Sequence, residues 1–191
     1  TNNKDLPLDQ FIEFALYDKD KGYYMKKNPF GKEGDFITAP NITRLFSEII
    51  AIWVVTFWKS IGSPKKFNLV ELGAGNGEMM KVIDETLKNF PECFLNCNCQ
   101  IHEKSEFLKK KQKINLELEK ITWIENIEIA NSFPTIFLAN EFFDALPIKQ
   151  FFRKKEGWGE RFVNLNEEDK AEFKEQVTDI KIIEQKLNFE I

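Results

Sequence analysis

The segment from Phe67 to Met80, FNLVELGAGNGEMM, constrains the fold more than any other part of the chain. Within it, a short apolar run ends at Gly73, Gly75 and Gly77, and an amphipathic segment follows directly. This order predicts a strand, a tight turn whose backbone can approach a ligand, and a helix whose first amides face the same point. A ligand site is therefore expected where the strand ends.

The composition is that of an ordinary globular protein. The chain has 191 residues, of which 42% are hydrophobic and 30% charged, so it is long enough to bury a core as one domain. Within residues 1–191 we expect a helical N-terminal cap with a loop over residues 1–62 and the core over residues 63–191. The net charge of -4 gives no reason to expect a nucleic-acid partner.

The most apolar run, Ile49–Trp58, is about half the length needed to cross a bilayer, so no membrane span is expected. No signal peptide is visible, and the cysteines Cys93, Cys97 and Cys99 cannot pair completely. Both observations favour a reducing, cytoplasmic location. A zinc site with His102 is disfavoured, because Cys97 and Cys99 share a strand parity that His102 does not.

The residues before the glycine segment predict two helices around a structured loop. Leu6–Tyr17 predicts a helix that Asp9 can cap, and Pro29–Pro40 has two glycines, two prolines and no helical period. Thr38 can cap a second helix that runs to about Ser60. Large apolar residues predict that this second helix is well buried. They are Leu45, Phe46, Ile49, Ile52 and Trp53, with Trp58 beyond them.

Strands and helices then alternate. An apolar helix stripe follows the glycines, and Ser105 can cap a further helix. The stripe comprises Met79, Met80, Ile83 and Leu87; the expected strands are Cys97–Glu103, Ile121–Ile124 and Thr135–Ala139. This alternation predicts a Rossmann-like α/β fold, a largely parallel sheet with helices on both faces.

The last part of the chain has weaker signals. Ile148–Phe152 and Arg161–Leu165 flank Gly157-Trp158-Gly159, which predicts a hairpin with its turn at the glycines. A polar helix and then a weak strand, DIKIIEQ (Asp179–Gln185), are expected after it.

The glycine pattern indicates which ligand to expect. A dinucleotide site needs a third glycine where Glu78 stands, and a phosphate-binding loop needs a Gly-Lys-Ser/Thr sequence that does not follow here. The chain instead has an acid, Glu71, followed by three alternating glycines that end at Gly77. A carboxylate at Glu71 suits a ligand that carries an amino group and a sulfonium cation. Glu103, at the end of the next expected strand, can accept hydrogen bonds from both hydroxyls of a ribose. The pattern favours S-adenosylmethionine over a merely structural turn.

Five segments together resemble the MidA family of methyltransferases, which includes the mitochondrial complex I assembly factor that is a protein arginine methyltransferase. They are GDFITAP (Gly34–Pro40), ELGAGNG (Glu71–Gly77), the E-x-S-x-x-L-x-x-x-Q run (Glu103–Gln112), ANEFFDALP (Ala139–Pro147) and GWGER (Gly157–Arg161). The resemblance implies S-adenosylmethionine as cofactor and an arginine side chain of a protein as substrate. A subunit of a respiratory complex is the implied partner.

The chain also departs from the family pattern. Ala74 and Asn76 stand where the family has proline and arginine, and Asn41 stands where it has glutamate. Glu106 and Lys109 replace a proline and an arginine. Family members also continue with further strands of the sheet, so the resemblance implies a fold truncated at its C-terminus, as a fragment or a shortened gene product.

Candidate catalytic residues follow the fourth expected strand. Glu141 and Asp144 are spaced i, i+3 and can hold a guanidinium if the segment turns helically; Asn140 can contact the cofactor or accept from the substrate nitrogen. Capping of a helix N-terminus is the alternative role for the two acids. Asp35 and Thr38 can close over the methionine part of the cofactor, or be a turn acid and a helix cap. Core packing is expected for the two phenylalanines between the acids.

Two other functions stay open. One is a non-catalytic assembly or interaction protein that retains a truncated methyltransferase fold. The other is methylation of a small amine or of a nucleic-acid base, which the acidic composition disfavours for nucleic acid.

Overall fold

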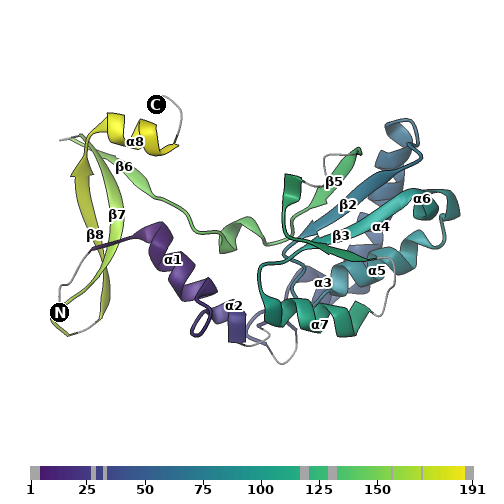
Figure 1. The fold of residues 1–191 in the computed structure, drawn as a ribbon, viewed down its shortest axis with the longest axis horizontal. Helices are drawn as coiled ribbons and strands as arrows, with labels where there is room; N and C mark the ends of the chain where they lie inside the picture. The colour runs from purple at the N-terminus through teal and green to yellow at the C-terminus, as the bar shows by residue number, and fades with distance from the viewer. Residues whose placement is uncertain are drawn as a thin grey trace. The chain divides into compact units, whose positions relative to one another are not determined.

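The computed structural model describes residues 5–26, 29–31, 34–116, 121–128, 133–155, 157–168 and 170–187 (Figure 1). The chain divides into two compact units, one of residues 24–144 and one of residues 1–23 with 145–191. We call them the parallel unit and the antiparallel unit after their sheets, and describe each by itself. The single domain expected from the sequence stays a prediction.

The parallel unit contains the predicted parallel sheet. Its four strands, in the spatial order β4-β3-β2-β5, are all parallel, with Phe67 opposite Cys97 and Asn68 opposite Thr135. The strands are β2 (Phe67–Leu72), β3 (Cys97–His102), β4 (Thr122–Ile124) and β5 (Thr135–Leu138). Each lies within one residue of its predicted bounds, so the strand predictions are confirmed.

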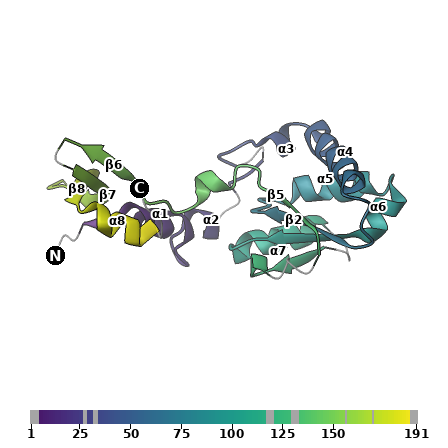
Figure 2. The same cartoon turned by 90° about the horizontal axis from the view of Figure 1, so that it is seen from above.

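Helices cover one face of this sheet. The helices of the unit are α3 (Ala39–Ile42), α4 (Arg44–Ser60), α5 (Glu78–Leu87), α6 (Pro91–Asn96) and α7 (Glu106–Leu116); α2 (Tyr23–Lys26) lies at its boundary. Figure 2 shows α3, α4 and α5 on the same side of the strands. Helix α7 packs against α5, and its Leu116 joins the same core.

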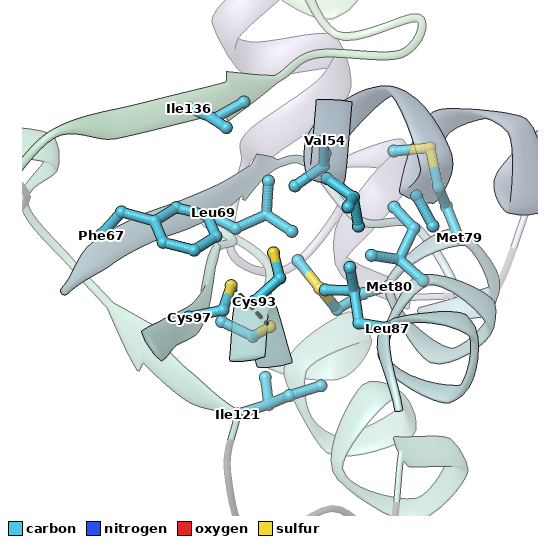
Figure 3. Packing of buried hydrophobic residues seen from close by; sticks show 14 of the residues in the cluster. Val54, Phe67, Leu69, Met79, Met80, Leu87, Cys93, Cys97, Ile121 and Ile136 are labelled. Atoms are coloured by element: carbon cyan, nitrogen blue, oxygen red, sulfur yellow. Dashed lines mark hydrogen bonds between the residues drawn. The ribbon is translucent and has the colours of Figure 1, made fainter. Parts of the chain in front are cut away.

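The core between α4, α5 and the sheet is formed by side chains from one face of the strands (Figure 3). Phe67 and Leu69 of β2 are fully buried there, together with the predicted stripe of α5. All three cysteines lie in this core, and the Cys97 and Cys99 sulfurs are 3.7 Å apart. The shared strand parity of these two cysteines is therefore confirmed.

The helix expected from Thr38 to Ser60 is interrupted, which corrects the prediction. Thr43 has an extended backbone (φ -148°, ψ 131°) that separates α3 from α4, and its Oγ1 accepts a hydrogen bond from the Leu45 amide at 3.2 Å. Thr43, not Thr38, is therefore the side-chain cap of the long helix. The predicted end of the helix at Ser60 is confirmed.

The burial predicted for α4 was also wrong for most of the large residues. Leu45, Ile49, Ile52 and Trp53 are 48–59% exposed, whereas Ala51, Val54, Val55 and Trp58 face the sheet. A helix that is apolar on all sides has no periodic signal to show which side packs. Of the two tryptophans, the prediction of burial holds for Trp58 alone.

The second face of the sheet carries a smaller apolar group and a polar row. Val70, Leu72 and Ile124 are buried on it. Asn68 donates to Thr135 Oγ1 at 3.3 Å and accepts from Asn98 at 3.2 Å. In the described residues of the connection from β4 to β5 there is no α-helix of the kind expected on this face, and Ile127 of that connection packs on the apolar group.

The antiparallel unit has four strands in one sheet, in which β7 pairs with β1, β6 and β8. Its elements are β1 (Leu6–Pro7), α1 (Leu8–Tyr17), β6 (Phe151–Lys154), β7 (Gly157–Leu165), β8 (Ala171–Thr178) and α8 (Ile180–Leu187). The predicted hairpin is confirmed as β6 and β7, but its turn lies earlier than expected. Gly159 is inside β7, where an added Cβ would lie 2.3 Å from the Phe152 ring, so glycine leaves room for that ring.

Two further predictions for this unit were wrong. The end of the chain is a strand followed by a helix, the reverse of the expected order. Asp9 does not cap α1, whose N-cap is Pro7; the Asp9 carboxylate instead binds Lys149 Nζ at 2.7 Å.

Candidate functional site

A cavity of about 40 Å³ lies at the carboxyl end of β2 in the parallel unit. Its walls come from the loop before α3, from the glycine turn and from the residues after β5. Six residues predicted for the site line it: Thr38, Glu71, Gly73, Gly75, Asn140 and Glu141. The carboxyl ends of parallel strands are where open α/β sheets bind ligands, so the position agrees with the expected site.

The glycine turn has a backbone that side chains would prevent. Gly73, Gly75 and Gly77 have φ values of +67°, +55° and +86°. An added Cβ at Gly73 would lie 2.7 Å from the Phe142 ring, and one at Gly75 would lie 3.2 Å from the Phe30 ring. Gly77 is outside the cavity wall and is the N-cap of α5. The three glycines therefore shape the turn, and two of them also line the cavity.

Glu71 is a buried acid with an unsatisfied oxygen. The residue is 3% exposed, it lines the cavity, and its Oε2 has no hydrogen-bond partner among the residues that the structure describes. Burial raises the pKa of Glu71 to about 8, although a hydrogen bond from the Met80 amide opposes the shift. A cationic ligand group in the cavity would favour the charged carboxylate and satisfy this oxygen.

Glu103 is connected to the cavity through Gln112. It is 8% exposed, and its two carboxylate oxygens accept from the Ser105 amide at 2.9 Å and from Gln112 Nε2 at 3.0 Å. Burial raises the pKa of Glu103, while these hydrogen bonds oppose the shift. Gln112 is fully buried; it also donates to the Gly75 carbonyl at 2.9 Å and accepts from Trp123 Nε1 at 2.8 Å. One glutamine thus joins the second-strand acid to the glycine turn.

The role of Gln112 was not predicted, although it is the last residue of the run that begins at Glu103. Ser105 caps α7 as expected, accepting from the Leu108 amide at 3.2 Å, and its hydroxyl donates to the Tyr24 carbonyl at 2.7 Å. The spacing of that run therefore places three buried polar side chains around one end of α7.

The loop before α3 contributes Thr38 but not Asp35. Thr38 is buried at the N-cap position of α3 without capping it; its Oγ1 accepts from Asn41 Nδ2 at 2.9 Å. Asn41 Oδ1 in turn accepts from Asn76 Nδ2 at 2.8 Å. Asp35 is exposed and does not line the cavity. The two asparagines, both departures from the family pattern, are hydrogen-bonded to each other.

The two candidate catalytic acids are not on one helical face. Glu141 has a φ of +49°, a left-handed conformation that is rare for residues with a side chain, and Asp144 lies in the 3-10 turn Phe143–Ala145. The premise that the two acids share one helical face is therefore wrong. Asp144 does lie in the first turn of a 3-10 helix, so the alternative role at a helix N-terminus stays a prediction for that acid. Backbone strain such as that of Glu141 gathers at functional sites, and here it occurs in the cavity wall.

Tyr24 is a site residue that sequence reasoning missed. Its ring stacks on Phe30, with centroids 6.1 Å apart and planes 11° apart. Burial raises the pKa of the Tyr24 phenol, and the charges of Asp144, Glu103 and Glu141 raise it further. The negative charges of these acids therefore act on one half-buried phenol, whose ring stacks on the cavity residue Phe30. The pair Tyr23-Tyr24 carries no periodic signal that would have identified it.

The two phenylalanines between the acids differ. Phe142 packs on the smaller apolar group of the second sheet face and against Gly73, so its predicted packing role is confirmed. Phe143 is 68% exposed and meets Phe142 edge-on, with centroids 5.5 Å apart. Its predicted burial was wrong, because few described side chains cover that face.

In the described part of the chain, no cluster of three or more histidine, cysteine, aspartate or glutamate side chains is arranged to hold a metal ion. The helices in that part also include none with the length and apolarity to cross a membrane.

Comparison with known proteins bears on the ligand. The family model described as "Putative S-adenosyl-L-methionine-dependent methyltransferase" matches residues 49–188. The chain belongs to this family. The resemblance to MidA proteins inferred from the five segments is thereby confirmed.

Curated relatives carry a more specific name. The human mitochondrial protein arginine methyltransferase NDUFAF7 is 30% identical over 190 residues, which cover 86% of this chain and 43% of the human protein. The Xenopus tropicalis protein of the same name is 29% identical over 185 residues, covering 84% of this chain and 43% of its own length. The chain thus spans less than half the length of these relatives.

A solved structure shares the fold. A protein from Burkholderia thailandensis, whose crystal structure is bound to S-adenosyl-homocysteine, matches with a TM-score of 0.79 at 22% identity. The match covers 96% of this chain and 49% of that chain. The α/β fold with a parallel sheet is therefore the fold of this relative.

Proposed function

We propose that the chain is an S-adenosylmethionine-dependent methyltransferase that methylates an arginine nitrogen of a protein. The observation that carries the cofactor is the unpartnered, buried Oε2 of Glu71 in a cavity walled by left-handed glycines. Membership of the family supports the reaction, and the names of the curated relatives support arginine as the acceptor.

The residues present fit the cofactor. Glu71 offers a carboxylate to a cationic group, and Gly73 and Gly75 let the backbone come close to the ligand. Glu103 keeps free lone pairs for ribose hydroxyls, because each of its oxygens can accept more than one hydrogen bond. When bound, S-adenosylmethionine supplies an activated methyl group, and its sulfur takes the electron pair of the broken carbon–sulfur bond.

The remaining task of the protein is to place the acceptor nitrogen and exclude water. Glu141 and Asp144 hold the planar guanidinium, since carboxylates pair with it in a fixed geometry. Tyr24 contributes an aromatic face that a cation can approach. Asn140, at the end of β5, is the neutral acceptor for an N–H of the substrate. The acceptor nitrogen loses one proton as it gains the methyl group.

Titration calorimetry tests the cofactor assignment. S-adenosyl-homocysteine and S-adenosylmethionine should bind, and NAD should not. Binding of NAD alone would overturn the assignment.

Transfer is tested with S-adenosylmethionine carrying a labelled methyl group and an arginine-containing protein extract. Label should appear in methylarginine after acid hydrolysis. The rival function is a non-catalytic interaction protein, and the observation behind it is Asn41, which stands where the family has glutamate. Cofactor binding without any methyl transfer would support that rival.

A subunit of a respiratory complex as substrate and a cytoplasmic location belong to the same proposal. The relatives named above are mitochondrial by name, so fractionation of cells that express the chain distinguishes the two compartments.

A further inference from the structure

The loop before α3, together with the first turn of α3 itself, forms a large part of the cavity wall, and we call these two segments together the loop. In the described residues 29–31 and 34–43, Phe30, Thr38, Pro40 and Asn41 all line the cavity. The position of this loop therefore decides the shape of the site.

The loop is closed on itself by backbone hydrogen bonds. The Phe36 amide donates to the Pro29 carbonyl at 2.8 Å, and the Gly31 amide donates back to the Phe36 carbonyl at 3.0 Å. A third bond runs from the Gly34 amide to the Gly31 carbonyl at 3.0 Å. These three bonds join residues 29–31 to residues 34–36.

Hydrogen bonds of two side-chain amides connect this loop to the glycine turn. Asn76, between Gly75 and Gly77, donates from Nδ2 to Asn41 Oδ1 at 2.8 Å, and Asn41 donates from Nδ2 to Thr38 Oγ1 at 2.9 Å. The pair lies next to Gly31, whose added Cβ would be 3.7 Å from Asn41 Oδ1 and 3.9 Å from Asn76 Nδ2. The hydrogen bond between Asn41 and Asn76 therefore lies close to Gly31, the residue after Phe30.

Asn76, the residue of the glycine turn in this pair, is held in place by further hydrogen bonds. Asn115 of α7 donates to the Asn76 carbonyl at 3.0 Å, and the Glu78 amide donates to Asn76 Oδ1 at 3.4 Å. Asn76 is thus fixed to two helices, so the Asn41 bond transfers that fixed position to the loop.

We propose that Asn41 and Asn76 are positioning residues that form an amide latch, which holds the loop over the cofactor site. The latch keeps the Phe30 ring against Gly75 and the Thr38 hydroxyl in the cavity wall. Neutral amides suit this position, because neither residue adds a charge that would compete with Glu71 for a cation. The inference rests on the proposed function only for the identity of the ligand.

A double-mutant cycle tests the latch. Asn41→Ala and Asn76→Ala should each weaken S-adenosyl-homocysteine binding by about three- to ten-fold, the range for losing one hydrogen bond. The double variant should lose less affinity than the two single losses added together, because both changes remove the bond between the two side chains. Hydrogen exchange of the amides in residues 34–43 should accelerate in all three variants.

Three further variants separate positioning from general destabilisation. Asn41→Gln keeps a neutral amide that can both accept from Asn76 Nδ2 and donate to Thr38 Oγ1, so it should bind S-adenosyl-homocysteine more tightly than Asn41→Leu, which can do neither. Asn89→Ala removes an exposed amide that bonds only within the end of α5, and it should leave both binding and loop exchange unchanged.

Additive losses in the cycle, or single variants that bind as tightly as the unchanged chain, would overturn the latch. Failure of the unchanged chain to bind S-adenosyl-homocysteine would instead count against the proposed function. In that case loop exchange in the unliganded variants still decides the latch: unchanged exchange rates would reject it.

Discussion

All six residues of β2 in the parallel unit are buried, whereas the described side chains of β8 in the antiparallel unit are all exposed. The buried apolar side chains of the antiparallel unit are Leu8, Val163 and Ile183, as far as the structure describes them. In the parallel unit, two residues of the cavity wall, Ala74 and Met79, belong to a continuous core. The difference teaches that the site is built on the unit whose geometry is enforced by packing.

The largest expected effect compares one glycine from each unit. Gly75→Val should weaken S-adenosyl-homocysteine binding by more than about 100-fold, because φ is +55° and the new side chain meets the Phe30 ring. Gly157→Val in β7, where φ is +131° and no atom lies within 4 Å of an added Cβ, should leave binding unchanged. Calorimetric titration measures both, and equal losses would show that the comparison fails.

The second-largest expected difference between the units is the loss of unfolding free energy when an apolar side chain is truncated. Leu69→Ala should lower the free energy of unfolding by about 3 kcal/mol, because the side chain is fully buried and a cavity is left. Val177→Ala in β8, where the side chain is 62% exposed, should cost less than about 0.5 kcal/mol. Urea titrations followed by circular dichroism give both values; a similar loss for the two would contradict the exposed state of β8.

Carboxylates in the two units should respond to pH with opposite signs. The folded pKa of Glu71 is raised to about 8 from an ordinary 4.5, so the folded state holds more protons and stability falls as pH rises between these values. The hydrogen bond from Lys154 lowers the pKa of Glu175, whose contribution is present above its ordinary pKa and is lost as pH falls through its lowered value. Glu71→Gln should flatten the alkaline decline, and Glu175→Gln should not.

The measurement is unfolding stability of the three proteins at intervals from pH 3 to pH 9. S-adenosylmethionine should also bind Glu71→Gln more weakly, and the deficit should grow as pH rises through about 8, where the unchanged carboxyl becomes charged. A deficit that is the same at every pH would show that the Glu71 charge is not used.

Helix caps give the smallest effect. Thr43→Ala removes the hydrogen bond to the Leu45 amide and should cost about 1 kcal/mol of unfolding free energy, because α4 packs on the core. Asp179→Ala removes a bond of 2.9 Å to the Lys181 amide at the start of α8, and should fray that helix with a smaller global cost. Hydrogen exchange of α8 distinguishes local fraying from global loss.

The same contrast explains how far the sequence could predict the fold. In the parallel unit, strand β2 and the apolar stripe of α5 are buried. The apolar pattern located β2 to within a residue and identified the buried side of α5. In β8, the exposed side chains of the described residues have no apolar alternation, so a strand was read as a helix. A strand was therefore predicted correctly where its side chains are buried, as in β2, and missed where they are exposed, as in β8.

The candidate site was predictable where its residues are neighbours in the sequence. Glu71 and its glycines are such neighbours, and they line the cavity apart from Gly77. Hydrogen bonds between distant segments were not predictable: Gln112 donates to the Gly75 carbonyl, and Asn76 donates to Asn41. Polar side chains carry no periodic signal, so only the folded arrangement identifies these partners.

The three cysteines of the chain all lie in the parallel unit, and their exposed fractions are 1%, 8% and 4% for Cys93, Cys97 and Cys99. Burial also raises the pKa of Cys93 to about 11, and thiols alkylate as thiolates. A thiol reagent therefore reacts only when the parallel unit opens, and it is blind to opening of the antiparallel unit. The alkylation rate of the unmutated chain therefore measures how often the parallel unit opens. If S-adenosyl-homocysteine slows alkylation, the size of the decrease gives the affinity of the site for this ligand.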